Sequence, residues 1–334
     1  MERSIGKFKA YKITEVDKKA SAAFVDFTLD QLDPGEVVVR VAYSDVNFKD
    51  ALAATGKGRI LLRPECIGGI DLSGTVVSST DARFAKGDAV LATGFDLGVK
   101  HHGGYAEYAR VPADWLVKLP QGLSLLDAMA FGTAGFTAGL GIVRMEQNGL
   151  KPSNGPVIVN GATGGVGSIA IDALSRLGYH VVALTGKEAE TDYLKKLGAK
   201  EVMLRQGIDL TKIRPLDRAQ WAGAIDNLGG EVLAWMASTM KVGGTIASIG
   251  LAASPSLPTT VLPFILRGVS LLGIDSVNCP MPLRQEVWWR LATDLRPVHL
   301  KEMTKTVAFE NLPSVFNAFV EAKATGRTVV DMAA

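Results

Sequence analysis

The sequence predicts an α/β protein that combines a β-rich N-terminal domain with a doubly wound parallel sheet. Up to about residue 125, short apolar runs are separated by glycine and proline, which is typical of a small barrel or sandwich. From about residue 126, strands alternate with helices, which indicates parallel strands joined by right-handed crossovers. A glycine cluster between one such strand and its helix is the third observation, since doubly wound nucleotide-binding folds carry one there.

The N-terminal strands are short and closely spaced. We expect strands at residues 36–43 (EVVVRVAY), 71–79 (DLSGTVVSS), 88–93 and 103–112. One helical segment, residues 46–56, interrupts them. Short strands with turn residues between them and a single inserted helix support the barrel or sandwich.

The second part of the chain repeats a strand–helix unit. The expected strands are residues 156–162, 180–184, 200–204, 222–226 and 244–250. The expected helices are residues 165–177, 190–197, 231–240 and 282–295, and a last helix and strand fall within residues 312–332. Gly178 and Gly198 end the first two helices, because glycine readily adopts the left-handed conformation that follows a helix.

Composition excludes several classes of function. The 334 residues are 47% hydrophobic and 21% charged, with a net charge of +2, so neither a nucleic-acid partner nor an acidic membrane surface is expected. No signal peptide is evident, and the most apolar run, residues 261–274, is short and broken by Arg267. Cys66 and Cys279 form no metal or redox motif. We therefore expect a cytoplasmic protein with reduced cysteines.

The glycine cluster in residues 160–168 (NGATGGVGS) is the main functional motif. Gly164 and Gly165 allow a phosphate to approach the backbone, and Gly167 allows the helix to pack on the strand. The first helical N–H groups, at Val166 and Ser168, then face the pyrophosphate. A methyltransferase would usually carry an acid after the second strand, and the chain lacks the Tyr-x-x-x-Lys pair of short-chain dehydrogenases.

The second strand of this unit ends in a cation instead of an acid. An acidic residue here would bind the ribose 2′-hydroxyl of NAD. The chain instead has Thr185, Gly186 and Lys187, and Arg205 follows the next strand. These groups suit a ribose 2′-phosphate, so NADPH is the expected cofactor, although Lys187 could also be an ordinary surface lysine.

The chain also resembles a known family along its whole length. Residues 83–90, 103–112, 132–138, 160–168 and 326–330 resemble the medium-chain dehydrogenase/reductase superfamily. Residues 47–58, 69–76, 221–226 and 257–277 resemble its acrylyl-CoA reductase branch, whose members are also named quinone oxidoreductases.

That resemblance implies two domains and a reaction. Residues 1–125 would form a GroES-like domain of β-barrel type, to which residues 300–334 return, and residues 126–299 a Rossmann domain. It further implies NADPH, a homodimer, and reduction of an activated carbon–carbon double bond. Leu251 and Ser276 match segments beside the nicotinamide and are expected cofactor contacts, although Leu251 could be core packing.

Zinc is not expected. Zinc-dependent relatives place Cys in the segment matching residues 45–51 and His-Glu in the segment matching residues 68–74. This chain has Asn47 in the first and Gly69-Ile70-Asp71 in the second, and residues 131–137 contain no Cys for a third ligand. These residue types do not supply a tetrahedral zinc site.

The candidate catalytic residues follow from the same segment. Asn47 is expected to contact the substrate or the nicotinamide ribose through its amide, or to cap the following helix. Lys49 and Asp50 lie on the next turn, and Asp50 could instead pair with Lys49 or Arg59. A proton donor is not identified: Tyr43 and solvent are open, and His101 and His102 could serve, although a surface pair is the commoner case. 

Three functions remain open. The first is NADPH-dependent reduction of acrylyl-CoA to propionyl-CoA, in which Lys57, Arg59 and Arg63 would bind the phosphates of CoA unless they are solvated loop charges. The second is a quinone or enone reductase without preference for CoA. The third is a protein that binds NADPH without turnover, because a fold does not fix a function.

Overall fold

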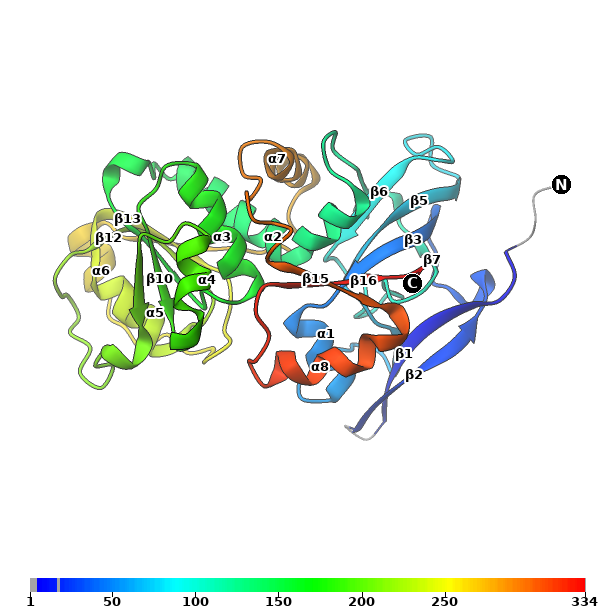
Figure 1. Cartoon of the computed structure of the whole chain (residues 1–334), viewed down its shortest axis with the longest axis horizontal. Coiled ribbons are helices and arrows are strands. Elements are labelled where there is room, and N and C mark those ends of the chain that lie inside the picture. The colour runs from blue at the N-terminus through cyan, green and yellow to red at the C-terminus, as the bar shows by residue number, and fades with distance from the viewer. Residues whose placement is uncertain (1–4, 17–18, 334) are drawn as a thin grey trace. The chain divides into compact units, whose positions relative to one another are not determined.

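The structure, a computed structural model, describes residues 5–16 and 19–333. The chain divides into two compact units (Figure 1). Unit 1 consists of Met1–Thr133, Val277–Gln285 and Lys301–Ala334, and unit 2 of Ala134–Ser276 and Glu286–Leu300.

Unit 1 is built from two sheets that are largely antiparallel. The three-stranded sheet has the order β2-β1-β4, with strands β1 (Phe8–Val16), β2 (Lys19–Phe27) and β4 (Glu65–Ile67). The seven-stranded sheet has the order β15-β16-β3-β5-β6-β8, with β7 also paired to β3. Its strands are β3 (Val37–Asp45), β5 (Asp71–Ser79), β6 (Ala89–Thr93), β7 (Tyr108–Val111), β8 (Val117–Lys118), β15 (Thr304–Ala308) and β16 (Arg327–Asp331).

The end of the chain completes this sheet. β16 pairs antiparallel with β3, where Val329 lies opposite Asp45 and Asp331 opposite Tyr43. The helices of this unit include α1 (Phe48–Thr55), α8 (Leu312–Val320), η1 (Leu29–Gln31), η2 (Ala113–Trp115) and η6 (Phe309–Asn311). The pairing of β16 therefore places residues near position 327 beside the start of α1.

Unit 2 contains a parallel six-stranded sheet with the order β11-β10-β9-β12-β13-β14. Its strands are β9 (Val157–Asn160), β10 (Val181–Thr185), β11 (Glu201–Leu204), β12 (Trp221–Asp226), β13 (Met240–Ser248) and β14 (Ser270–Gly273). Its helices are α3 (Gly165–Arg176), α4 (Thr191–Lys196), α5 (Gly230–Ser238), α6 (Leu262–Arg267), η3 (Pro152–Asn154), η4 (Glu188–Glu190) and η5 (Arg205–Gly207). The strand order reverses between β9 and β12, as in a doubly wound dinucleotide-binding sheet.

Two helices, α2 (Leu125–Gln147) and α7 (Met281–Ala292), begin in one unit and end in the other. α2 is long and apolar enough to cross a membrane, but 83% of its most apolar window is buried in the protein, as in a core helix. It is interrupted at Gly132, whose φ of 51° and ψ of −156° are not helical. The most apolar run noted in the sequence, residues 261–274, instead contains the short helix α6 and the edge strand β14.

Candidate functional site

The glycine loop joins β9 to α3 and leaves the start of that helix open. Gly164 caps α3, and the N–H groups of Gly165, Val166 and Gly167 make no hydrogen bond within the described part of the chain. A Cβ on Gly167 would lie 2.5 Å from the carbonyl oxygen of Gly161, so only glycine fits. The loop thus offers three adjacent donors at a helix N-terminus, an arrangement that binds phosphate.

Ser168 differs from the expectation. Its N–H donates to the Gly164 carbonyl (2.9 Å), and its fully buried hydroxyl donates to the Ala162 carbonyl (3.4 Å). The same hydroxyl accepts a hydrogen bond from Tyr193 on α4 (2.9 Å). Because all these groups are engaged inside the protein, Ser168 is corrected to a structural residue of the loop. No sequence pattern indicated Tyr193 as its partner.

The cationic residues meet at the ends of β10 and β11. Thr185 pairs with Leu204 across these strands, and its buried hydroxyl accepts the N–H of Lys187 (3.0 Å). A Cβ on Gly186 would lie 3.9 Å from Nε of Arg205, which is exposed and makes no ion pair with any described residue. Thr185, Gly186, Lys187 and Arg205, which we call the cationic corner, therefore lie together.

Burial affects the charge of this corner. Lys187 is half-buried, and its pKa is lowered by that burial, an effect that Glu190 opposes. A bound phosphate would stabilise the charged ammonium and so oppose the desolvation. This is the environment expected for a lysine that meets an anion.

The remaining predicted cofactor contacts follow other strands of the parallel sheet. The carboxyl ends of these strands also carry a hydrogen-bond network that was not predicted from the sequence. Leu251 follows β13 and is 65% exposed, so the alternative of core packing is wrong, and Ser276 follows β14 and is half-buried. Asn160 ends β9 and donates to Asp226 at the end of β12 (2.6 Å), while the N–H of Asn227 donates to Asn160 (2.6 Å). The sequence signal that could have indicated this network is a polar residue at the end of each of two apolar strands.

Unit 1 contains a second polar centre, made of buried side chains and the half-buried Thr133. We call it the buried polar cluster; its members are Asp45, Asn47, Asp50, Asp71, Thr133 and Arg327. They come from the end of β3, the start of α1, the start of β5, α2 and the start of β16. Only Asn47, Lys49 and Asp50 of this region were singled out as catalytic from sequence.

Asn47 is the N-cap residue of α1, as one of the two interpretations predicted, and it also joins two carboxylates. Its Nδ2 donates to Oδ1 of Asp45 and to Oδ2 of Asp71, both at 2.8 Å. Its backbone N–H donates to Asp50 (2.9 Å). Both amide hydrogens are therefore committed within the protein.

Asp50 and Lys49 are not partners. Asp50 accepts the N–H groups of Asn47 and Ile70 (2.9 and 3.0 Å), and it makes no ion pair with Lys49 or Arg59 in the described structure, so that alternative is wrong. Lys49 is half-buried and makes no hydrogen bond or ion pair with a described residue. It occupies the second position of α1, where the helix dipole disfavours a cation.

The carboxyl group of Asp50 should make stability depend on pH. Burial, and then the nearby charge of Asp71, raise the pKa of Asp50 from 3.8 to about 7. The folded protein then holds a proton that the unfolded chain releases, so the free energy of unfolding should fall as pH rises from about 4 to about 7. Asp50→Asn should flatten this dependence in denaturant titrations across that range, and an unchanged slope would contradict the assignment.

His101 and His102 are buried, not the surface pair that was considered the commoner case. Nδ1 of His102 accepts the Ile67 N–H (3.0 Å), and burial lowers the pKa of His102 to about 4. The ring nitrogens of His101 lie 3.0 Å from the carbonyl oxygens of Pro34 and His102. These contacts hold the loop in place and give no support to a role as proton donor.

The residues at the zinc-ligand positions do not fit zinc. Asn47 and Thr133 both donate to Asp71, with the Thr133 hydroxyl 2.5 Å from Oδ1, and Ile70 has no ligating atom. Arg327 further pairs with Asp45. No group of three or more His, Cys, Asp or Glu in residues 5–16 and 19–333 could hold a metal ion. The donors are arranged to satisfy each other instead of a cation.

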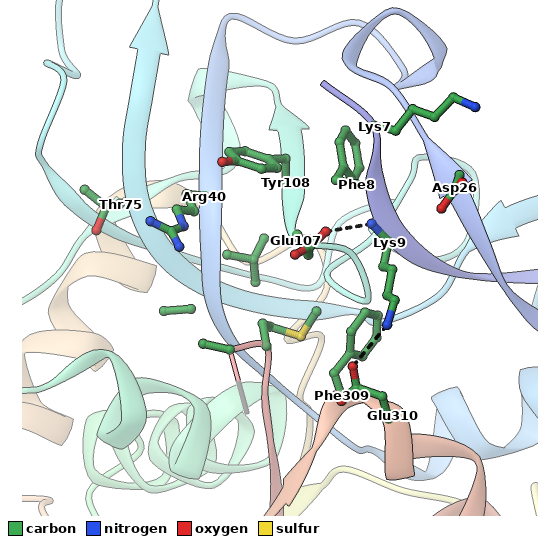
Figure 2. A pocket seen from close by; sticks show the side chains of 14 residues that line it. Lys7, Phe8, Lys9, Asp26, Arg40, Thr75, Glu107, Tyr108, Phe309 and Glu310 are labelled. Carbon is green, nitrogen blue, oxygen red and sulfur yellow. Dashed lines mark hydrogen bonds and ion pairs between the residues drawn. The ribbon is translucent and has the colours of Figure 1, made fainter. Parts of the chain in front are cut away.

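A separate groove of about 700 Å³ lies on unit 1, where β3 changes its partner from β7 to β16 (Figure 2). Glu107 accepts the backbone N–H of Lys9 (2.7 Å), and Glu310 pairs with its ammonium (3.4 Å). The charged side chains that line the groove balance in number. The cations are Lys7, Lys9 and Arg40, and the anions are Asp26, Glu107 and Glu310. No member of the buried polar cluster lines it, so we do not assign the reaction to this groove.

Known proteins are similar to this chain along most of its length. Residues 33–121 match the family described as alcohol dehydrogenase GroES-like domain, and residues 165–292 match zinc-binding dehydrogenase. Acrylyl-CoA reductase AcuI from Ruegeria pomeroyi is 45% identical over 318 residues, with 95% of this chain and 96% of that protein covered. The putative quinone oxidoreductase YhfP of Bacillus subtilis is 47% identical over 326 residues, with 97% and 99% covered.

Solved structures agree with the fold. The yhdH oxidoreductase from Salmonella enterica, in complex with NADP, has a TM-score of 0.94 at 45% identity and covers 97% of this chain and 99% of its own. YhfP from Bacillus subtilis, with NAD bound, has a TM-score of 0.95 at 46% identity and covers 98% and 100%. The predicted fold class, a GroES-like domain with a doubly wound Rossmann sheet, is confirmed.

Proposed function

Because the chain belongs to the medium-chain dehydrogenase/reductase superfamily, we propose that it uses NADPH to reduce the double bond of acrylyl-CoA to propionyl-CoA. The observation that carries the choice of NADPH is the cationic corner at the ends of β10 and β11. The choice of thioester rests on the relatives named acrylyl-CoA reductase, such as that of Ruegeria pomeroyi. The family resemblance also leads us to propose a homodimer.

The glycine loop and the cationic corner would hold the nucleotide. The N–H groups of Gly165, Val166 and Gly167 suit its pyrophosphate, and Lys187 with Arg205 suits the 2′-phosphate. Gly164, Leu251 and Ser276 are further proposed contacts. When bound, NADPH supplies the hydride that adds to the β-carbon of the thioester.

Charge then develops on the thioester oxygen, and a donor must stabilise the resulting enolate. We assign this task to Lys49, since this residue is half-buried and makes no hydrogen bond or ion pair with a described residue. It also lies in the first turn of α1, where the helix dipole does not stabilise a cation. Asn47 contacts the bound ligand, and Asp50 fixes Asn47 through its backbone N–H. The α-proton comes from Tyr43 or from solvent.

The basic residues first proposed for CoA separate into two kinds. Lys57 and Arg59 are exposed and make no ion pair within the described residues, so they remain candidates for the CoA phosphates. Arg63 instead contacts Asp33 at 2.7 and 2.9 Å and the Lys100 carbonyl at 3.0 Å. Arg63 is therefore dropped from the proposed CoA site.

Neutralising Lys57 and Arg59 together should raise KM for acrylyl-CoA at least roughly tenfold, because one charge-assisted contact alone is worth about 1.5–3 kcal/mol and up to two are lost. The KM for a small enone should stay unchanged. The matched control is Lys19→Ala, an exposed lysine on β2. A KM for acrylyl-CoA that stays at the wild-type value would remove these residues from the proposal.

A quinone reductase is the second candidate, and the observation that favours it is the 47% identity to the Bacillus protein named a putative quinone oxidoreductase. Oxidation of NADPH should be measured with acrylyl-CoA, crotonyl-CoA and a simple quinone side by side. We expect turnover with acrylyl-CoA. Turnover with the quinone alone would support the second candidate, and tight NADPH binding with no turnover would support a non-catalytic protein.

A further inference from the structure

The side-chain amide of Asn47 lies between two carboxyl groups and a guanidinium, which together favour one orientation. Its Nδ2 is 2.8 Å from carboxylate oxygens of both Asp45 and Asp71, and its Oδ1 is 3.4 Å from Nη1 of Arg327. The opposite orientation would place the amide oxygen against two carboxyl groups and the NH2 group against a guanidinium. Charge therefore fixes which end of the amide points where.

The neighbours that impose this orientation are themselves held. Oδ2 of Asp71 accepts the Thr133 N–H (2.7 Å) as well as the Asn47 amide, and its Oδ1 accepts the Thr133 hydroxyl. Arg327 donates from Nε to the Ala130 carbonyl (2.9 Å) and pairs through Nη2 with Asp45. Each anchor is bonded on more than one side, so neither can turn without breaking several contacts.

The exposure and hydrogen bonds of Asn47 decide which hydrogen-bonding group it presents to a ligand. Among the charged and amide groups of the cluster, Asn47 is the most accessible at 8%, against 0–2% for Asp45, Asp50, Asp71 and Arg327. Both of its amide hydrogens are used internally. Its oxygen faces the backbone N–H of Asp50 in the capping box without a side-chain cap hydrogen bond, and its contact with Arg327 is long, so it keeps accepting capacity. Asn47 therefore presents an acceptor, not a donor.

We propose that Asp71 and Arg327 are positioning residues that fix Asn47 as a hydrogen-bond acceptor for a ligand hydroxyl. Such hydroxyls occur on the ribose of the nucleotide and on the CoA moiety of the thioester. The enolate oxygen is excluded as the partner, because it needs a donor. This inference rests on the proposed function only in naming these two ligands.

The first test observes the amide itself in the wild-type protein. Asn47 side-chain ¹⁵N–¹H signals are assigned by their loss in Asn47→Ser, and their hydrogen exchange is measured alone, with NADPH, and with the product propionyl-CoA. We expect both protons to exchange slowly in all three samples and to keep their shifts. A ligand that takes over one of these protons would move its signal strongly and overturn the proposal.

The second test measures binding of NADPH and propionyl-CoA separately. Asn47→Leu should weaken the ligand that supplies the hydroxyl roughly three- to tenfold, the value of one neutral hydrogen bond, and leave the other unchanged. Asp71→Asn and Arg327→Lys should weaken the same ligand and speed exchange of the Asn47 amide. The matched control, Asp172→Asn, removes another buried carboxylate that accepts two backbone N–H groups in unit 2 and should change neither.

The outcomes separate the inference from the proposed function. Normal binding of both ligands by Asn47→Leu would overturn the acceptor role even if the wild type reduces acrylyl-CoA rapidly. Failure of the wild type to reduce acrylyl-CoA would overturn the proposed substrate, while the exchange and NADPH-binding results would still decide the role of Asn47.

Discussion

Replacing Lys187 with alanine is expected to weaken NADPH binding roughly tenfold to a hundredfold and to change NADH binding little. The reason is the loss of one charge-assisted contact to the 2′-phosphate, worth about 1.5–3 kcal/mol. Lys187 follows β10 and Arg205 follows the adjacent parallel strand β11, with Arg205 close to Gly186, so both cations lie at the same edge of the sheet. Titration of the protein with each nucleotide, followed by its fluorescence, measures both constants.

The control for this change is Lys195→Ala, which removes an exposed lysine from the neighbouring helix α4 without touching the cationic corner. Arg205→Ala should show the same preference, weakening NADPH more than NADH. Equal losses for both nucleotides would mean that Lys187 does not meet the 2′-phosphate. The comparison matters because one similar structure holds NADP and another holds NAD.

The elements that sequence predicted well are those with local signals. The helix expected at residues 165–177 is α3 (Gly165–Arg176), because glycines mark both of its ends and Gly178 has a φ of +85°. The strands β1 and β2 were missed, since their sequences mix charged and apolar residues without the turn residues that punctuate later strands. Helix α2 was also missed because glycines interrupt its apolar pattern.

Only part of the candidate site could be predicted from the sequence. Asn47 and Asp50 belong to one short segment, so a motif could find them. Arg327 lies 280 residues from Asn47, and only the pairing of β16 with β3 brings the two together. The direction of the Asn47 amide depends on three charged neighbours at once, which no spacing rule can supply.

Gly132→Ala is expected to lower the free energy of unfolding by about 3–5 kcal/mol or to prevent folding, because it breaks a buried ion pair. A Cβ at this position would lie 1.7 Å from Oδ2 of Asp45 and 2.8 Å from Nη2 of Arg327. The backbone there, at φ 51° and ψ −156°, is also close to a region essentially confined to glycine. Thermal and denaturant unfolding of the purified variant measure the loss.

Gly87→Ala separates backbone strain from the clash. Gly87 lies in unit 1 with a φ of +94°, and a Cβ there would meet nothing within 4 Å, so its replacement should cost only the conformational strain of about 1–2 kcal/mol. The strain of the Gly132 backbone itself accounts for about 1–3 kcal/mol, and any loss in Gly132→Ala beyond that comes from separating Asp45 from Arg327. Equal losses in the two variants would mean that the ion pair can move aside, and the rigid anchoring inferred for Asn47 would fail with it.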